Sequence, residues 1–134
     1  MDMLTPLTPI VIKAPRTNWG TASIGFAENI SLRIGNPTAE PTIHVCLIRP
    51  LVLGRAVGDD PEVHINLEAY EATQKGVSRQ HASLTLVAKI VMLTDLESVN
   101  GTFLNGQRLS PNQHYIVRNG DEIRLGQLLI YIYL

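Results

Sequence analysis

The sequence contains a single cysteine, so no disulfide bond can form within the chain. Cys46 stands in an apolar run, where we expect it to be a small buried side chain. The four histidines and this cysteine show no recognised metal-ligand spacing, and neither a phosphate loop nor a dinucleotide fingerprint is present. We therefore expect neither a metal ion nor a cofactor.

Aromatic residues are also scarce, at 5% of the chain, and the formal net charge is only -1. Few aromatic platforms and no overall basic charge make a nucleic-acid-binding barrel a weak alternative. No apolar run reaches the roughly 18 to 20 residues that cross a bilayer. The start of the chain lacks the basic and apolar regions of a secretory signal. We expect a cytoplasmic protein that binds neither nucleic acid nor membrane.

The first 28 residues differ from the rest of the chain. Pro6, Pro9 and Pro15 interrupt them, and they show no sustained period of 2 or 3.6. This pattern predicts a flexible N-terminal tail or linker over residues 1–28, with one extended piece at 10–13. Residues 29–134 are then one domain, a size that suits a single hydrophobic core.

Short alternating apolar segments separated by turn residues fill residues 29–134, and they predict an all-β fold. Only residues 68–74 have helical character, enough for about one turn. Many short strands with almost no helix indicate a β-sandwich or a barrel, and periodicity does not choose between them. The last strand is apolar on both faces, which favours burial on both sides or cover from a neighbour. The expected strands are 31–34, 42–48, 51–55, 63–67, 82–87, 90–95, 102–104, 107–109, 115–117, 122–125 and 128–133.

Four motifs follow one another on the predicted strand ends. They are Gly54-Arg55, the sequence Ser-Arg-Gln-His at 78–81, Asp-Leu-Glu-Ser-Val-Asn-Gly-Thr-Phe-Leu-Asn-Gly at 95–106, and Asn-Gly-Asp-Glu-Ile-Arg-Leu-Gly at 119–126. In this order, over about residues 31–134, they closely resemble the forkhead-associated (FHA) domain family.

The resemblance implies a β-sandwich of about eleven strands in two sheets, with loops at one end that bind phosphothreonine in an extended peptide. Position by position, it implies that Arg55, Ser78 and Arg79 contact the phosphate. Asn100 would bind the peptide main chain beside it. The residues implied to shape the loops are Gly54, His81 and Gly101.

The chemistry of these side chains agrees with that role. A phosphothreonine carries about -1.5 to -2 charges and three acceptor oxygens at neutral pH. An arginine presents a planar fork to two of those oxygens, and a serine hydroxyl can donate to a third. Lys75 adds a further positive charge in the loop before Ser78. Two positions depart from the family pattern: Val99 stands where a hydroxyl is frequent, and Gly76 offers no side chain to the peptide.

Two other functions compete with this one. Ser78, His81 and Asp95 resemble a nucleophile, base and orienter on paper, but residues three apart at a strand start point to opposite faces. We therefore expect a binding module and not an enzyme. The second alternative is an FHA-fold domain that binds its partner independently of phosphate, which Val99 keeps open.

The expected partner is a phosphothreonine-containing protein, the substrate of a serine/threonine kinase, in signal transduction. Self-association through a phosphorylated tail is a further possibility, because the tail contains Thr5, Thr8 and Thr17. For Arg79 the competing interpretation is a surface salt bridge.

Overall fold

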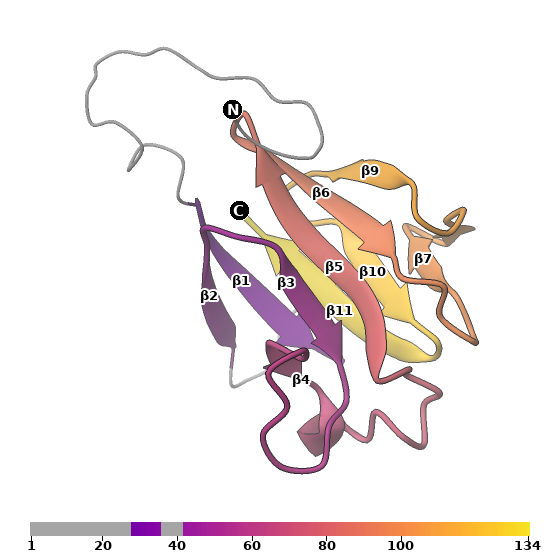
Figure 1. Cartoon of the computed structure of the whole chain (residues 1–134). Helices are drawn as coiled ribbons and strands as arrows, with labels where there is room; N and C mark the ends of the chain where they lie inside the picture. The colour runs from indigo at the N-terminus through magenta and orange to yellow at the C-terminus, as the bar shows by residue number, and fades with distance from the viewer. Residues whose placement is uncertain (1–27, 36–41) are drawn as a thin grey trace.

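The computed structural model describes residues 28–35 and 42–134 of the chain (Figure 1). The extended piece expected at residues 10–13 and the tail threonines lie outside them. The described residues form eleven strands and one short 3₁₀ helix. These are β1 (Glu28–Ile34), β2 (Ile43–Leu47), β3 (Leu51–Gly54), β4 (Ile65–Asn66), η2 (Glu68–Tyr70), β5 (Gln80–Val87), β6 (Ile90–Asp95), β7 (Thr102–Leu104), β8 (Gln107–Arg108), β9 (His114–Val117), β10 (Glu122–Leu125) and β11 (Leu128–Tyr133).

The strands form two sheets that pack face to face, so the fold is a β-sandwich and not a barrel. The six-stranded sheet has the order β2-β1-β11-β10-β7-β8, and the five-stranded sheet has the order β4-β3-β5-β6-β9. Twenty buried apolar side chains form one cluster with contributions from both sheets. The expected all-β fold with eleven strands in two sheets is confirmed.

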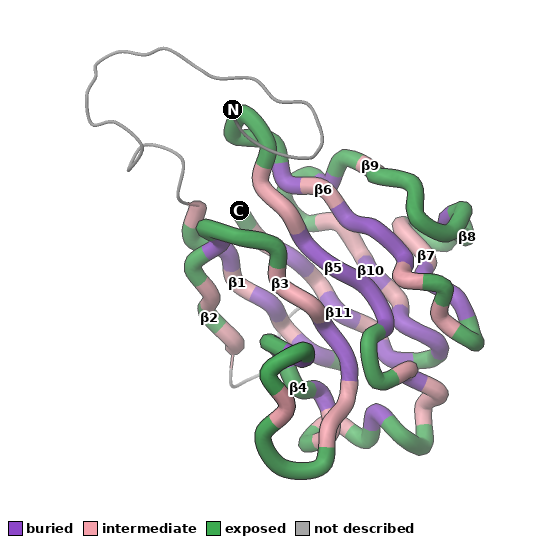
Figure 2. Tube along the Cα trace, in the orientation of Figure 1, coloured by how far each residue is buried: buried purple, intermediate pink, exposed green. Residues whose placement is uncertain are grey.

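Burial alternates along the strands, as the period of two in the sequence predicts. In β1 the side chains of Ile30, Leu32 and Ile34 are buried while their neighbours are not. Figure 2 shows the same alternation along β11, whose pattern is buried, half-buried, buried throughout. The expectation that β11 is covered on both faces is therefore only half met. Its outer face carries Tyr131 and Tyr133, and both rings are partly exposed.

Cys46 corrects another expectation, because its side chain is exposed and not buried. β2 lies at the edge of the six-stranded sheet, and the pleat turns Val45 and Leu47 toward the core. A residue between these two must face outward. The apolar run around Cys46 is thus a one-sided strand, which composition alone did not distinguish from a buried one.

Several connections gather at one end of the sandwich, at the bottom and lower right of Figure 1. They are the β3–β4 loop, the segment that leads into β5, and the β10–β11 turn. The segment into β5 is long, but Leu67, Ala72 and Val77 are buried and anchor it to the core. The Val77 N–H also donates to the Ala72 carbonyl at 2.9 Å. Ser78 therefore follows an anchored residue and has a defined position.

Candidate functional site

Arg55 follows β3 directly and is half-buried. Its Nε donates a hydrogen bond of 2.6 Å to the Val77 carbonyl, which belongs to the residue before Ser78. This bond uses one of the five N–H groups of the guanidinium and fixes the plane of the fork. The two terminal nitrogens keep their N–H groups for another acceptor beside Ser78.

Ser78 lies between Arg55 and the β6–β7 loop. Its Oγ accepts a hydrogen bond of 3.1 Å from the Val99 N–H. A hydroxyl that accepts this bond still has its own proton to donate. Val99 is 82% exposed. The position that often carries a hydroxyl in the FHA pattern therefore presents an apolar side chain at the rim of the site.

His81 is fully buried and connects two of the loops. Its Nδ1 accepts from the Ser78 N–H at 3.0 Å, so Nδ1 carries no proton. The proton is then on Nε2, which donates to the Gly101 carbonyl at 2.9 Å. Both ring nitrogens are therefore occupied by backbone groups, and neither bonds the Ser78 hydroxyl as a general base would.

Asp95 holds the loop that carries Asn100, a role that the sequence analysis missed. Its buried carboxylate accepts from the hydroxyls of Ser98 at 2.5 Å and Thr102 at 2.6 Å. The Ser98 Oγ in turn accepts from the Gly101 N–H at 3.0 Å. The spacing of Asp95 and Ser98, three residues apart in a turn, is a local signal for such side-chain bonding. Both of these hydroxyls bond Oδ1, and the Ser98 N–H donates to Oδ2 at 3.3 Å, so both carboxylate oxygens are used inside the loop.

Asn100 is exposed at the tip of this loop, and its Nδ2 donates to the Gly76 carbonyl at 2.9 Å. Its Oδ1 remains available as an acceptor. Two backbone bonds draw the β10–β11 turn into the same cluster: Gln127 N–H donates to the Lys75 carbonyl at 2.8 Å, and Gly126 N–H to the Gly101 carbonyl at 3.0 Å. Three loops thus meet around Asn100.

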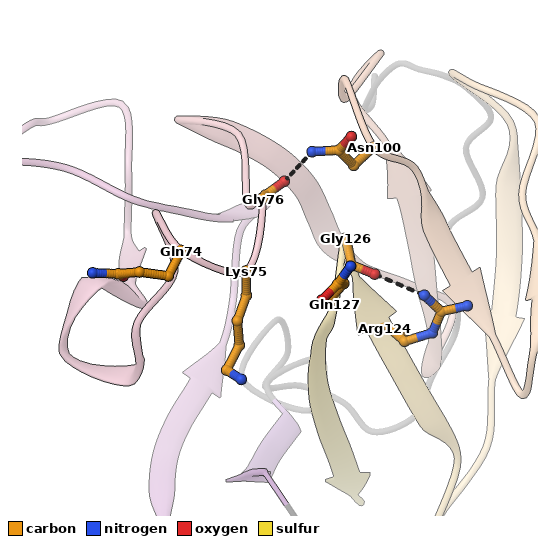
Figure 3. Close-up of a pocket in the computed structure, with 7 residues that line it drawn as sticks. All are labelled: Gln74, Lys75, Gly76, Asn100, Arg124, Gly126 and Gln127. Atoms are coloured by element: carbon orange, nitrogen blue, oxygen red, sulfur yellow. Dashed lines mark hydrogen bonds between the residues drawn. The ribbon is translucent and has the colours of Figure 1, made fainter.

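A cavity of about 380 Å³ opens between these three loops (Figure 3). In Figure 3 the Asn100 amide reaches Gly76, whereas the Lys75 side chain extends away from Asn100. The Arg124 guanidinium lies beside the β10–β11 turn and donates to the Gly126 carbonyl at 2.8 Å. The lining is polar and carries two positive charges. It consists of Gln74, Lys75, Gly76, Asn100, Arg124, Gly126 and Gln127.

Arg79 is exposed between Ser78 and the start of β5. Its carbonyl accepts from the Arg55 N–H at 3.2 Å, so its backbone helps to place Arg55. Its guanidinium forms no ion pair with the residues that the structure describes. The described residues therefore offer no acidic partner for the surface salt bridge that was the alternative role of Arg79.

No group of three or more potential metal-ligating side chains occurs in residues 28–35 and 42–134. Nor does this part of the chain contain a helix long and apolar enough to cross a bilayer.

The buried His81 predicts a pH-dependent stability. Burial lowers the pKa of His81 below its usual value of 6.5, although the Gly101 carbonyl and Asp95 oppose this shift. The unfolded chain therefore takes up a proton near pH 6.5 that the folded domain accepts only at lower pH. We expect the melting temperature to fall as the pH decreases through 6.5, because protonation of Nδ1 also removes the acceptor of the Ser78 N–H.

Thermal unfolding between pH 5 and 8, together with NMR titration of the imidazole resonances, tests this prediction. The exposed His44 offers a matched control, and His44→Gln is expected to keep the pH dependence. A His81 resonance that titrates at or above pH 6.5 would contradict the prediction.

Comparison with known proteins agrees with this architecture. The FHA domain family model matches residues 51–126, more than half of the chain. FhaA, an FHA domain-containing protein of Mycobacterium tuberculosis, is 39% identical over 57 residues, which are 42% of this chain and 10% of that protein. The serine/threonine-protein kinase cds1 of Schizosaccharomyces pombe is 57% identical over 37 residues, 28% of this chain and 8% of the kinase. The chain therefore matches a tenth or less of each relative's length.

Solved FHA domains share the fold. The N-terminal FHA domain of Rad53p from Saccharomyces cerevisiae, solved with a phosphothreonine peptide, matches with a TM-score of 0.62 and 20% identity, covering 80% of this chain and 94% of that one. A domain from a study of phosphothreonine-dependent FHA domain interactions matches with a TM-score of 0.61 and 24% identity, covering 80% and 97%. The family match over residues 51–126 and the shared sandwich together show that this chain belongs to the FHA domain family.

Proposed function

We propose that this domain binds phosphothreonine in an extended segment of a partner protein, and that Arg55 and Ser78 hold the phosphate. The observation that carries the proposal is the bond from Arg55 Nε to the Val77 carbonyl. It orients a guanidinium with unused terminal N–H groups next to a serine whose hydroxyl proton is also unused. Such a pair matches the acceptors of a phosphate dianion.

The neighbouring side chains complete the proposed site. Asn100 would accept a peptide N–H through its Oδ1, since its Nδ2 is bonded to Gly76. Arg79 is exposed beside Ser78 and would supply a second cation. Lys75 would add positive charge at longer range, and a direct phosphate contact requires its flexible side chain to rotate from the position in Figure 3. Gly54, His81 and Gly101 would fix the loops that carry these groups.

The proposed context is phosphorylation-dependent signalling in the cytoplasm. The partner would be a protein phosphorylated on threonine by a serine/threonine kinase. The N-terminal FHA domain of Rad53p, which has the same fold, is solved with a phosphothreonine peptide, and this supports the class of ligand. Self-association through a phosphorylated Thr5, Thr8 or Thr17 is a variant of the same proposal, in which a tethered motif occupies the site.

The competing function is partner binding that does not depend on phosphate. Val99 favours it, because an exposed valine replaces a potential donor at the rim of the site. The remaining donors of Arg55, Ser78 and Arg79 favour phosphate binding, because such groups gain little from an uncharged ligand.

A paired titration distinguishes these two functions. A library of phosphothreonine peptides and the same library after dephosphorylation are titrated against the full chain, and binding is followed by fluorescence anisotropy. We expect saturable binding of phosphorylated peptides only. Equal binding of both libraries would support phosphate-independent recognition and overturn the proposal.

A further inference from the structure

Two arginines share one phenylalanine ring on the outer face of the six-stranded sheet. The strand register places Phe103 of β7 opposite Arg108 of β8 on one side and Arg124 of β10 on the other. The guanidinium carbon of Arg124 lies 3.9 Å from the ring centroid, and that of Arg108 lies 5.8 Å from it. Both distances are within the range of cation–π contacts. These three residues are called the arginine row below.

The arginine row adjoins the loop that carries Asn100. Gly101 follows Asn100 and has a φ of +92°, and a Cβ at this position would lie 2.8 Å from the Arg108 Nε. The Arg108 guanidinium therefore occupies the space that a side chain at Gly101 would fill. At the other end of the row, Arg124 lines the cavity beside Asn100 and donates to the Gly126 carbonyl (Figure 3).

The two arginines of the row are held by the ring and by backbone, not by carboxylates. Neither Arg108 nor Arg124 forms an ion pair with a carboxylate of the described residues. Glu122, two residues before Arg124, instead accepts a hydrogen bond of 3.1 Å from the Tyr131 hydroxyl. Two positive charges are thus held close together by stacking on one ring, which restricts their motion before any ligand arrives. A preorganised cationic pair of this kind favours an acidic ligand.

The row also lies to one side of the proposed phosphate site. Arg55 directly follows β3 and Ser78 lies just before β5, and both strands belong to the five-stranded sheet. The arginine row belongs to the six-stranded sheet. The β6–β7 loop, with Asn100 at its tip, connects the two sheets. An extended peptide that runs from Ser78 past Asn100 therefore brings only one of its flanks to the row.

We propose that the arginine row is a second recognition element that binds aspartate or glutamate residues on one flank of the phosphothreonine in the partner protein. This inference rests on the proposed function, because the phosphothreonine sets the position of the acidic flank. It adds a chemical class of partner: a phosphothreonine segment with acidic residues on one side.

Three peptides with the same phosphothreonine core test the proposal on the full chain. One has neutral flanks, one has three glutamates before the phosphothreonine, and one has three glutamates after it. We expect a single one of the two acidic peptides to bind roughly threefold to tenfold more tightly than the neutral one, from two partly exposed ion pairs. Isothermal titration calorimetry at fixed ionic strength gives the ratio of the affinities.

Arginine variants test whether the arginine row causes the tighter binding of the acidic peptide. In Arg108→Gln the ratio of acidic to neutral affinity is expected to fall, and in the double variant with Arg124→Gln it is expected to approach one. Arg118→Gln is the matched control, because it removes an exposed arginine from the β9–β10 turn, which is bonded to the last residues of β11 at the opposite end of the sandwich. Its ratio should equal that of the unmodified chain.

The outcomes separate the two proposals. If the neutral phosphopeptide binds but neither acidic peptide binds more tightly than it, the proposal for the arginine row is overturned and the proposed phosphothreonine function stands. An equal gain from both acidic peptides, or a gain that survives in the double variant, indicates general electrostatic attraction and also overturns the row. If no phosphorylated peptide binds, both proposals are overturned.

Discussion

Replacement of Arg55 by alanine is expected to weaken phosphothreonine-peptide binding by roughly ten- to a hundredfold while the domain stays folded. A hydrogen bond to a charged group contributes about 1.5 to 3 kcal/mol, and this range corresponds to that loss of affinity. The Arg55 side chain is only half-buried, and its one side-chain hydrogen bond within the described residues goes to the Val77 carbonyl. The fold therefore depends on it less than the ligand does.

Arg55→Lys refines the experiment because it keeps the charge and removes the fork. A lysine cannot bond the Val77 carbonyl and present two further parallel donors to a phosphate. We expect its affinity to lie between those of the unmodified chain and Arg55→Ala. Arg118→Ala, which removes an arginine from the β9–β10 turn at the opposite end of the sandwich from Arg55, should bind with unchanged affinity. Titration calorimetry gives the dissociation constants, and circular dichroism checks the fold. A folded Arg55→Ala domain with an unchanged dissociation constant would place the site elsewhere.

Most strands were predictable because period-2 alternation survives wherever one face meets the core. β6 and β7, for example, have the expected bounds. β1 begins at Glu28, three residues before the expected start. Glu28 and Asn29 pair with β2 without an apolar signal of their own, and Ile30 extends the buried alternation of Leu32 and Ile34 by one position that the prediction left out. The choice between sandwich and barrel was not predictable. It depends on pairings such as β1 with β11, which join segments about a hundred residues apart in sequence.

For the candidate site, the sequence indicated which side chains gather but not how they are held. Arg55 and Ser78 were singled out from the motif order, yet the Val77 carbonyl that orients Arg55 is a backbone group with no sequence signal. Arg108 and Arg124 were missed for a similar reason. Their relation to Phe103 depends on the register of three strands, and register is a property of the folded sheet.

Gly54→Ala is expected to have the largest effect on stability, because the added methyl would overlap backbone. A Cβ on Gly54 would lie 1.8 Å from the Arg79 carbonyl oxygen and 2.6 Å from its carbon. The register between β3 and β5 shifts at this point, with Leu53 opposite Ala82 and Gly54 opposite Gln80. No side-chain rotation relieves the overlap, so β3 and β5 must separate. We expect a loss of about 3 kcal/mol or more, at the upper end of the range for overpacked sites.

Gly58→Ala is the matched control for this change. Gly58 has a φ of +76° and no atom within 4 Å of its Cβ position, so it isolates the backbone cost of an alanine in the left-handed region, about 1 to 2 kcal/mol. Urea unfolding should therefore show a larger loss for Gly54→Ala than for Gly58→Ala. Equal losses in the free energy of unfolding would mean that β3 and β5 separate without a measurable loss of stability.

The same overlap connects stability to the proposed binding site. The Arg55 N–H donates to the Arg79 carbonyl at 3.2 Å, and this is the oxygen that an alanine at position 54 would displace. Moving it separates Arg55 from Ser78, whose carbonyl would also lie 3.0 Å from the new methyl. The fraction of Gly54→Ala that remains folded should therefore bind phosphothreonine peptides more weakly than Gly58→Ala does. If the folded fraction binds with unchanged affinity, the spacing of β3 and β5 does not control the phosphate site.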